Sequence, residues 1–123
     1  MKTIPTNFIQ RLSFFAASVW LLPSIGIAAT VSVDCSSARL QAAIDQAKPG
    51  DTVTVSGTCN ENVLIPEQFA KITLDGGNAA TINGPDANRH SIEVRGRGIV
   101  IKGFTVTGGR SGIAVGWGGS ALI

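Results

Sequence analysis

The sequence predicts an all-β chain that winds as a parallel β-helix of about three coils, preceded by one short capping α-helix. Three observations predict this fold class. Apolar and polar residues alternate along most of the chain, which is typical of half-buried strands. The same order of short strands recurs after 21 to 27 residues, and most of the 15 glycines fall between those strands. A β-sandwich would not preserve that order, so the repeat favours stacked coils.

Nine short runs rich in Val, Ile and Thr end in Gly, Asn, Asp or Pro, which predicts short strands joined by tight turns. They span residues 52–55, 62–65, 72–75, 81–83, 92–95, 99–102, 104–107, 112–115 and 120–123. Three of these runs repeat in order. Residues 72–76 match 99–103, residues 81–84 match 105–108, and residues 92–96 match 113–116, at offsets of 27, 24 and 21. Counterparts should therefore lie on neighbouring coils.

Alternation predicts which side chains face the core, because successive side chains of a strand point to opposite faces. The apolar inward set is Ile72, Leu74, Ile82, Ile92, Val94, Ile99, Ile101, Phe104, Val106, Ile113 and Val115. The polar outward set is Thr73, Asp75, Asn83, Glu93, Arg95, Lys102, Thr105 and Thr107. Stacking places Asp75 next to Lys102, a pairing of opposite charges worth ~0.2–1 kcal/mol, so we interpret Asp75 as an ion-pair member rather than a catalytic carboxylate.

Residues 29–51 form an N-terminal segment with the capping helix, and residues 52–123 form the coils. Ser36 or Ser37 is the expected N-cap of the helix. Its apolar stripe has helical spacing and consists of Leu40, Ala43, Ile44 and Ala47. Residues 48–51, with Pro and Gly, end the helix. The stripe is small and suits a helix that lies across the end of a flat structure. We assign Asp45 and Glu61 to solubility or turn chemistry.

Residues 1–28 have the parts of a secretory signal peptide. Lys2 and Arg11 precede an apolar run over residues 12–22, and small residues follow at Gly26 and Ala28. Cleavage after Ala28 would leave 95 residues. The alternative is a membrane anchor, but the apolar run is shorter than the ~20 residues that cross a bilayer. We expect a secreted or periplasmic protein with no membrane association after cleavage.

If the chain is exported, its two cysteines are expected to form a disulfide. Cys35 and Cys59 are the two cysteines, and an oxidising compartment favours a disulfide between them. The closed loop would contribute on the order of 3 kcal/mol. Two thiols and the distant His90 do not make a four-ligand metal site, and no C-x-x-C spacing suggests redox chemistry. A structural disulfide is the preferred interpretation, and we expect no cofactor.

Composition and charge narrow the function classes. Hydrophobic residues make up 44% and charged residues 15% of the sequence, which excludes a disordered chain. Without the two leader cations, eight basic residues face eight acidic ones. The mature chain is therefore neutral and has no basic cluster, which argues against nucleic acid as a partner.

Three segments resemble the entry to right-handed parallel β-helix proteins of the pectin-lyase-like group. They are residues 40–47 (LQAAIDQA), 49–53 (PGDTV) and 61–63 (ENV), and the later runs 73–76 and 101–105 resemble the strand-turn pattern of that group's early coils. The resemblance implies right-handed coils, a helix over the first coil, and a relation to lyases and hydrolases of pectin or other uronate polysaccharides. These motifs are specific for architecture and carry little about activity.

The sequence departs from that group in its active-site motifs. No aligned aspartates for calcium, glycosidase carboxylate pair or methylesterase signature is found. The final residues 121–123 read as a strand without a cap, so we expect an N-terminal piece of a longer protein that by itself has no catalytic activity. The alternative is a non-catalytic cell-surface or adhesive β-helix scaffold. The oligomeric state is left open.

A few residues are candidates for contact with an acidic polysaccharide, the expected partner. Arg95, Arg97 and Arg110 can pair with uronate carboxylates, although nearby acidic residues favour a mixed solvated face. Trp117 lies between glycines, where it either stacks on a sugar ring or folds over the open end of the coils. His90 has no assignable catalytic partner, and we interpret it as an exposed turn residue.

Overall fold

The computed structural model describes residues 27–123, so the predicted signal peptide lies almost entirely outside the described residues. Its elements are β1 (Thr30–Asp34), α2 (Leu40–Asp45), β2 (Thr52–Ser56), β3 (Thr58–Cys59), β4 (Val63–Ile65), β5 (Thr73–Gly84), β6 (Ile92–Val94), β7 (Ile99–Gly108), β8 (Ile113–Val115) and β9 (Ala121–Leu122). Among residues 27–123, no helix is long and apolar enough to cross a bilayer.

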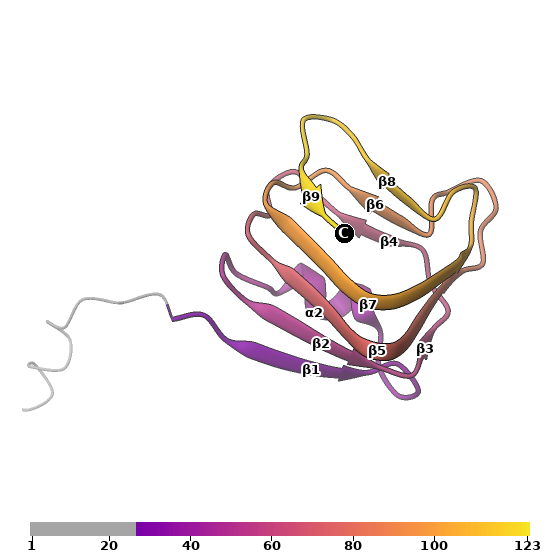
Figure 1. Ribbon diagram of the computed structural model, residues 1–123, viewed down its shortest axis with the longest axis horizontal. Helices are drawn as coiled ribbons and strands as arrows, with labels where there is room; N and C mark the ends of the chain where they lie inside the picture. The colour runs from indigo at the N-terminus through magenta and orange to yellow at the C-terminus, as the bar shows by residue number, and fades with distance from the viewer. Residues whose placement is uncertain (1–26) are drawn as a thin grey trace, which may run out of the picture.

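The strands form two parallel sheets that wind together as a β-helix of about four turns, which confirms the predicted fold class (Figure 1). The larger sheet has six strands in the order β1-β2-β5-β7-β9, with β3 also paired to β5. The smaller sheet has three strands in the order β4-β6-β8. The three middle coils therefore contribute strands to both sheets, and β1 and β9 lie at opposite ends of the larger sheet.

The predicted register is confirmed at each repeat. Leu74 pairs with Ile101 at an offset of 27, and Thr81 pairs with Thr105 at an offset of 24. In the smaller sheet Ile92 pairs with Ile113 at an offset of 21. The shrinking offsets come from the corners, because the strands themselves pair without slippage apart from an irregularity between Asp75 and Ala80. A one-residue slip would turn every apolar side chain toward solvent, so the alternation fixes the register.

The structure has one coil more than expected, because residues that the sequence analysis assigned to the helix segment form β1. This strand pairs in parallel with β2 over five residues, from Thr30↔Thr52 to Asp34↔Ser56. The two-residue β3 was also not predicted. In contrast, β5 and β7 each join two predicted strands and continue through the corner between them, where Gly77 and Gly103 have positive φ.

The core is a column of apolar side chains between the two sheets. Its fully buried members include Val53, Ile65, Ile72, Leu74, Ile82, Ile92, Val94, Ile99 and Ile101. The prediction of the inward set is confirmed for the coils that have a neighbour on both sides. Phe104, Val106 and Ile113 are only partly buried, and Val115 is 45% exposed, which makes its predicted burial wrong. These residues belong to the last coil, and no described coil follows it.

Close contact between coils explains why glycine occupies one corner. A Cβ atom added to Gly76 would lie 2.4 Å from the carbonyl oxygen of Gly103 on the next coil. Gly103 itself has a φ of +74°, in the left-handed region that favours glycine. These two residues let β5 and β7 bend together without separating the coils.

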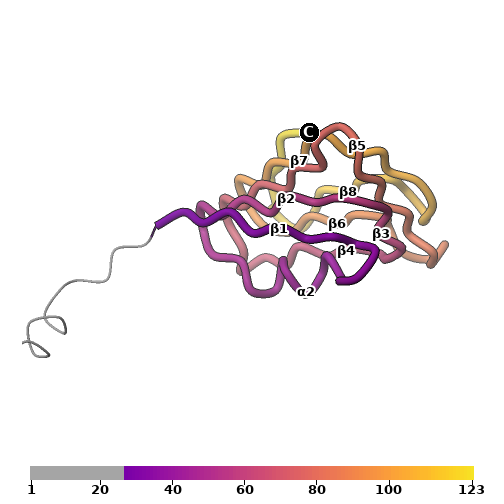
Figure 2. The backbone as a smooth tube through the Cα atoms, turned by 90° about the horizontal axis from the view of Figure 1, so that it is seen from below, coloured from indigo at the N-terminus to yellow at the C-terminus, as the bar shows by residue number. Residues whose placement is uncertain are grey.

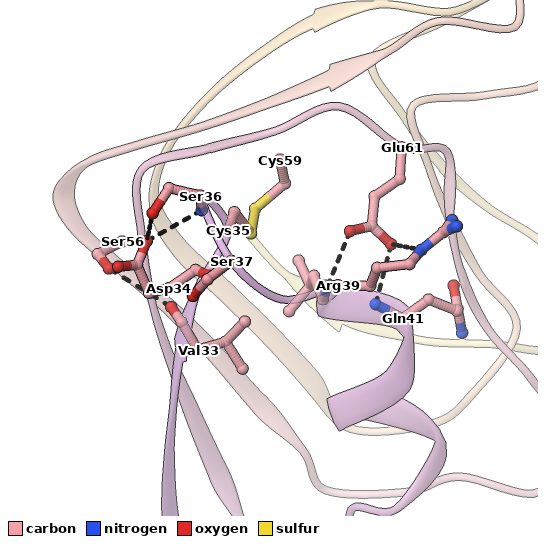
Figure 3. Close-up of a disulfide and its surroundings, with 11 residues drawn as sticks. Val33, Asp34, Cys35, Ser36, Ser37, Arg39, Gln41, Ser56, Cys59 and Glu61 are labelled. Atoms are coloured by element: carbon pink, nitrogen blue, oxygen red, sulfur yellow. Dashed lines mark hydrogen bonds and ion pairs between the residues drawn. A yellow bond between two sulfur atoms is a disulfide. The ribbon is translucent and has the colours of Figure 1, made fainter.

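The predicted disulfide is present and joins two coils (Figure 3). Cys35 follows β1 directly and Cys59 ends β3, with 5.0 Å between their Cα atoms. Cys59 is buried in the core. The bond therefore ties the first coil to the second at the corner where both leave the larger sheet. A disulfide is typical of proteins that fold in an oxidising compartment.

The capping helix is shorter than expected and neither serine caps it. The residue at its N-cap is Arg39, without a side-chain cap, and Ser36 instead donates to the Asp34 carboxylate. The carboxylate of Glu61 from the second coil accepts the backbone N–H groups of Leu40 at 2.8 Å and Gln41 at 3.0 Å (Figure 3). Of the two roles expected for Glu61, solubility or turn chemistry, its exposure of 5% excludes solubility, and its contacts give it a capping role. Orphan N–H groups of a first helical turn require such acceptors.

Strand β4 is the first strand of the smaller sheet. Helix α2 lies beside it, where another coil would place a strand. Leu40 and Ile44 reach into the core, and the helix packs against β4, β1 and β2. The side-chain amide of Gln41 donates to the carbonyl of Leu64 and accepts from its N–H, both at 2.8 Å. Gln41 thus satisfies the edge of β4 as a neighbouring strand would. Figure 2 views the molecule from the β1 side, with α2 at this end.

Candidate functional site

Three of the four candidate glycan-contact residues, Arg95, Arg97 and Trp117, lie at one corner of the coils, in the segments that leave the smaller sheet. We define the Trp117 corner as residues 116–120, after β8, together with the stacked segments 95–98, after β6, and 66–71, after β4. Backbone hydrogen bonds hold the layers together: Ser120 N–H to the Gly96 carbonyl at 2.9 Å, and Lys71 N–H to the Arg97 carbonyl at 2.8 Å. The loop between β8 and β9 is visible in Figure 1.

Trp117 extends into solvent from this corner. Its side chain is 77% exposed, and its φ of +56° is unusual for a bulky residue. Gly119 next to it packs so closely on the layer below that an added Cβ would lie 2.9 Å from the carbonyl oxygen of Gly96. Close packing of the loop therefore maintains a backbone conformation that costs about 1–3 kcal/mol. Of the two predicted positions, the exposed one is observed.

Arg95 supports the indole ring from beneath. Its guanidinium carbon lies 5.2 Å from the centroid of the Trp117 ring, within the range of a cation–π contact. The same guanidinium donates through Nε and Nη2 to Oε1 of Glu93, each at 2.7 Å. Glu93 thus fixes the plane of the guanidinium and neutralises it. Arg95 therefore orients the ring, and most of its charge is compensated before any ligand arrives.

Arg97 supplies the cation that is available at the corner. Its side chain is exposed, and Nε donates to the carbonyl of Gly118 at 3.3 Å. Within residues 27–123 it makes no ion pair, unlike Arg95. Arg97 thus uses one N–H to bind the loop that carries Trp117. Its other guanidinium N–H groups face solvent. Lys71 is exposed on the layer below and adds a second positive charge.

The corner offers a flat apolar surface next to planar cationic donors. An exposed indole can stack on the C–H face of a sugar ring, and a guanidinium can bind a carboxylate with two parallel hydrogen bonds. Such an arrangement provides binding and orientation. Proton transfer would require an acid or base within hydrogen-bond distance of the ligand, and Glu93, the acidic residue in contact with Arg95, is already engaged.

Other sequence candidates lie elsewhere. Arg110 is exposed at the other end of β8, where its N–H donates to the Arg89 carbonyl at 2.7 Å. His90 is half-buried rather than exposed, and its Nδ1 has no hydrogen-bond partner among residues 27–123. Its neighbours hold the loop in place: the Asn62 amide donates to the His90 carbonyl at 3.0 Å. Asp75 and Lys102 form the predicted ion pair, with 3.7 Å between Oδ2 and Nζ.

Metal chemistry has no visible centre in the described part of the chain. Among residues 27–123, no three His, Cys, Asp or Glu side chains gather in a group that could hold a metal ion.

Two buried carboxylates were missed in the sequence analysis. Glu61 caps α2, and Asp51 accepts the N–H groups of Ala29 at 3.0 Å and Lys48 at 2.9 Å. These two hydrogen bonds hold the pKa of Asp51 below its ordinary value, and the bond from Ala29 has the larger effect. A buried carboxylate of this kind can be recognised in the sequence when it directly adjoins a strictly alternating strand. Asp51 is such a case, because it directly precedes the strand Thr52–Ser56. The partner, however, lies about 20 residues away in sequence.

Comparison of the chain with protein-family models, with curated proteins and with solved structures finds no match. The relation to the pectin-lyase-like group therefore depends on the sequence motifs and stays a proposal.

Proposed function

We propose that this chain is an exported β-helix protein related to the pectin-lyase-like group, and that the Trp117 corner binds an acidic polysaccharide. The observation that carries the proposal is the exposed Trp117 ring, which contacts Arg95 and lies beside Arg97, whose guanidinium has no ion pair among residues 27–123. Exposure of a large aromatic residue on a strained backbone costs free energy, and such sites often serve ligand contact.

The chemistry of the corner favours a uronate over a neutral sugar. A neutral glycan would use the ring of Trp117 but would leave Arg97 without an anionic partner. A uronate presents a C–H face and a carboxylate on the same ring, which suits an indole and a guanidinium at the same corner. Glu93 is engaged by Arg95, and Glu67 on the segment 66–71 is an exposed carboxylate that alone does not make an acid–base pair, so we expect binding without bond cleavage.

Tryptophan fluorescence gives a direct test. The sequence has two tryptophans, and Trp20 lies in the predicted leader, so Trp117 is the sole fluorophore of a chain that begins at Ala29. Titration with oligogalacturonate should shift its emission, and neutral oligogalactan should bind at least several-fold more weakly. An emission spectrum that stays unchanged, together with no heat of binding in calorimetry, would contradict the proposal.

Variants separate the two contributions. By calorimetry, Trp117→Asn should abolish measurable binding, because Asn tolerates the left-handed backbone while removing the ring. Arg97→Gln should weaken binding of the uronate about tenfold and leave the weak binding of the neutral glycan unchanged. Arg110→Gln is the matched control, because Arg110 lies at the far end of β8 and should leave both affinities unchanged.

A second candidate is a non-catalytic cell-surface or adhesive scaffold, and the pairing of charges on the coils favours it. Asp75 pairs with Lys102 and Glu93 pairs with Arg95, so the four charged residues of the predicted outward set neutralise one another within the protein. If the folded protein binds neither glycan and produces no unsaturated product from polygalacturonate, with or without calcium, the scaffold function is favoured. Turnover of polygalacturonate would instead establish an enzyme.

A further inference from the structure

The residue directly before β1, Ala29, has its nitrogen bound by a buried carboxylate. Ala29 accepts the N–H of Thr52 at 2.9 Å through its carbonyl, which makes it the first residue held in the larger sheet. Its own N–H donates to Oδ1 of Asp51 at 3.0 Å. Asp51 is 6% exposed, and Oδ2 accepts the N–H of Lys48 at 2.9 Å. Both carboxylate oxygens are therefore positioned by the coil itself.

The two residues before Ala29 are held far less. Ile27 is 82% exposed and Ala28 is also exposed. Within residues 27–123, no hydrogen bond joins either of them to the coils. The peptide bond between Ala28 and Ala29 thus marks the change from accessible chain to bound strand. Leader peptidases require small residues at the third and the first position before the cut. Here these positions are Gly26 and Ala28.

We propose that the Ala28–Ala29 bond is hydrolysed during export and that Asp51 then binds the new α-ammonium group of Ala29. In the cleavage, one water molecule adds across the C–N bond: its oxygen completes the Ala28 carboxylate, and its two protons convert the Ala29 amide N–H into an ammonium group. The inference rests on export, which is one part of the proposed function, and is independent of glycan binding.

Asp51 gains more from the ammonium than from the amide. The amide of the uncut chain has one N–H, while the ammonium has three donors and a positive charge, and charge-assisted hydrogen bonds are about twice as strong as neutral ones. The N–H donors of Ala29 and Lys48 keep the pKa of Asp51 low, so the carboxylate is ionised at neutral pH. The nearby cations are the Lys48 side chain and Lys71, whose carbonyl accepts the Gly50 N–H.

The expected effect on the α-amino group has a definite sign. A free α-amino group titrates near pH 7.7–8.0, and an opposite charge within hydrogen-bond distance raises its pKa by about 1 unit or more. The pair therefore stabilises the fold fully below about pH 7.7, and this contribution is lost as the pH rises through the higher pKa of the folded state. Lys48 and Lys71 are present in every form of the chain, so their contributions cancel in a comparison.

The test has two parts. Intact mass and N-terminal sequencing of the full-length chain, recovered after export, should show Ala29 as the first residue. NMR titration of chains that begin at Ala29 should then give an α-amino pKa about 1 unit or more above that of Asp51→Asn. An acetylated chain that begins at Ala29 keeps the N–H but carries no charge, and it should lack the loss of thermal stability above pH 8.

Two results would overturn the inference. One is a mature protein whose first residue is not Ala29. The other is an α-amino pKa that is the same in the wild type and in Asp51→Asn, or equal pH profiles of stability for the free and acetylated chains. Neither result depends on oligogalacturonate, so a failure here is distinguishable from a failure of the Trp117 corner to bind a glycan.

Discussion

The two ends of the β-helix are built differently. At the N-terminal end, Leu40 and Ile44 fill the space between the sheets, and Gln41 satisfies the edge of β4. At the other end, Phe104 and Ile113 are only partly buried, and β8 has a paired neighbour on one side alone. Val115, Leu122 and Ile123 expose large apolar side chains there.

The difference shows what a β-helix coil requires beyond its own sequence pattern. Ile65, Val94 and Val115 occupy one column of the smaller sheet, in three successive coils. The first two are fully buried while Val115 is 45% exposed. Alternation determines which face of the sheet a side chain lies on. Whether that face is buried from solvent depends on a covering coil or cap. Stability in such stacked folds is approximately a sum over coils and the contacts between neighbours.

The largest difference between the ends should come from the disulfide, which holds the N-terminal end alone. Removal of the bond in a Cys35→Ala/Cys59→Ala variant should lower the free energy of unfolding by about 3 kcal/mol, because the unfolded chain regains the freedom of the loop. Urea unfolding measures the change. Reductant should shift the wild type by the same amount and leave the variant unchanged. Equal stability of both proteins would show that the first coil does not depend on the bond.

The column of the smaller sheet provides a comparison with identical chemistry. Val94→Ala should cost about 2 kcal/mol, because it leaves a cavity in a packed coil. Val115→Ala should cost less than about 0.5 kcal/mol, because its side chain is already partly in water. Both values come from the same unfolding measurement. Similar costs would mean that the last coil is packed as firmly as the middle one.

The cap itself is tested through Glu61. Glu61→Gln keeps the size of the side chain but loses the charge and one acceptor for the first turn of α2, so it should destabilise the protein by about 1–2 kcal/mol. Amide hydrogen exchange should increase at Leu40 and Gln41 and stay unchanged in β8. Glu67→Gln, at an exposed position, is the control and should have no measurable effect. Unchanged exchange at Leu40 in Glu61→Gln would contradict the capping role.

The smallest effect concerns pH at the first corner. The Ser36 hydroxyl, and after it the Ser36 N–H, hold the pKa of the exposed Asp34 below its ordinary value of 3.8. Its contribution to stability is therefore present above pH 3.8 and is lost as the pH falls through the lower pKa of the folded state. Carboxyl NMR should give a midpoint below 3.8 for Asp34, and Ser36→Ala should raise it. A midpoint that Ser36→Ala leaves unchanged would contradict this cause.

The fold was predictable where the signal is local and repeated, and the caps were not. The alternation in residues 72–74 and 99–101 fixes both the inward face and the register, so their pairing followed from the sequence. Glu61 caps α2 from 21 residues away, and local rules pointed to Ser36 or Ser37 instead. The strand Thr30–Asp34 (TVSVD) alternates too and repeats Thr52–Ser56 (TVTVS) at an offset of 22, but it precedes the helix and was read as part of the helix segment.

The candidate site was predictable in its members and not in its geometry. Arg95, Arg97 and Trp117 were singled out by residue type, and the offset of 21 between the last coils brings them to one corner. The contact of Arg95 with both Glu93 and Trp117 depends on rotamers that the sequence does not express. The role of the buried Asp51 was also missed, because its carboxylate binds Ala29, directly before the strand β1 that was not predicted.

The central claim is that neighbouring coils run parallel at the observed offsets, and interstrand nuclear Overhauser effects test it most directly. In a labelled chain that begins at Ala29, contacts should join backbone protons of Thr81 to those of Thr105 and its neighbours, and Ile92 to those of Ile113 and its neighbours. The direction of each pair should be parallel. Antiparallel patterns, or contacts at a different offset, would contradict the β-helix and everything inferred from its corners.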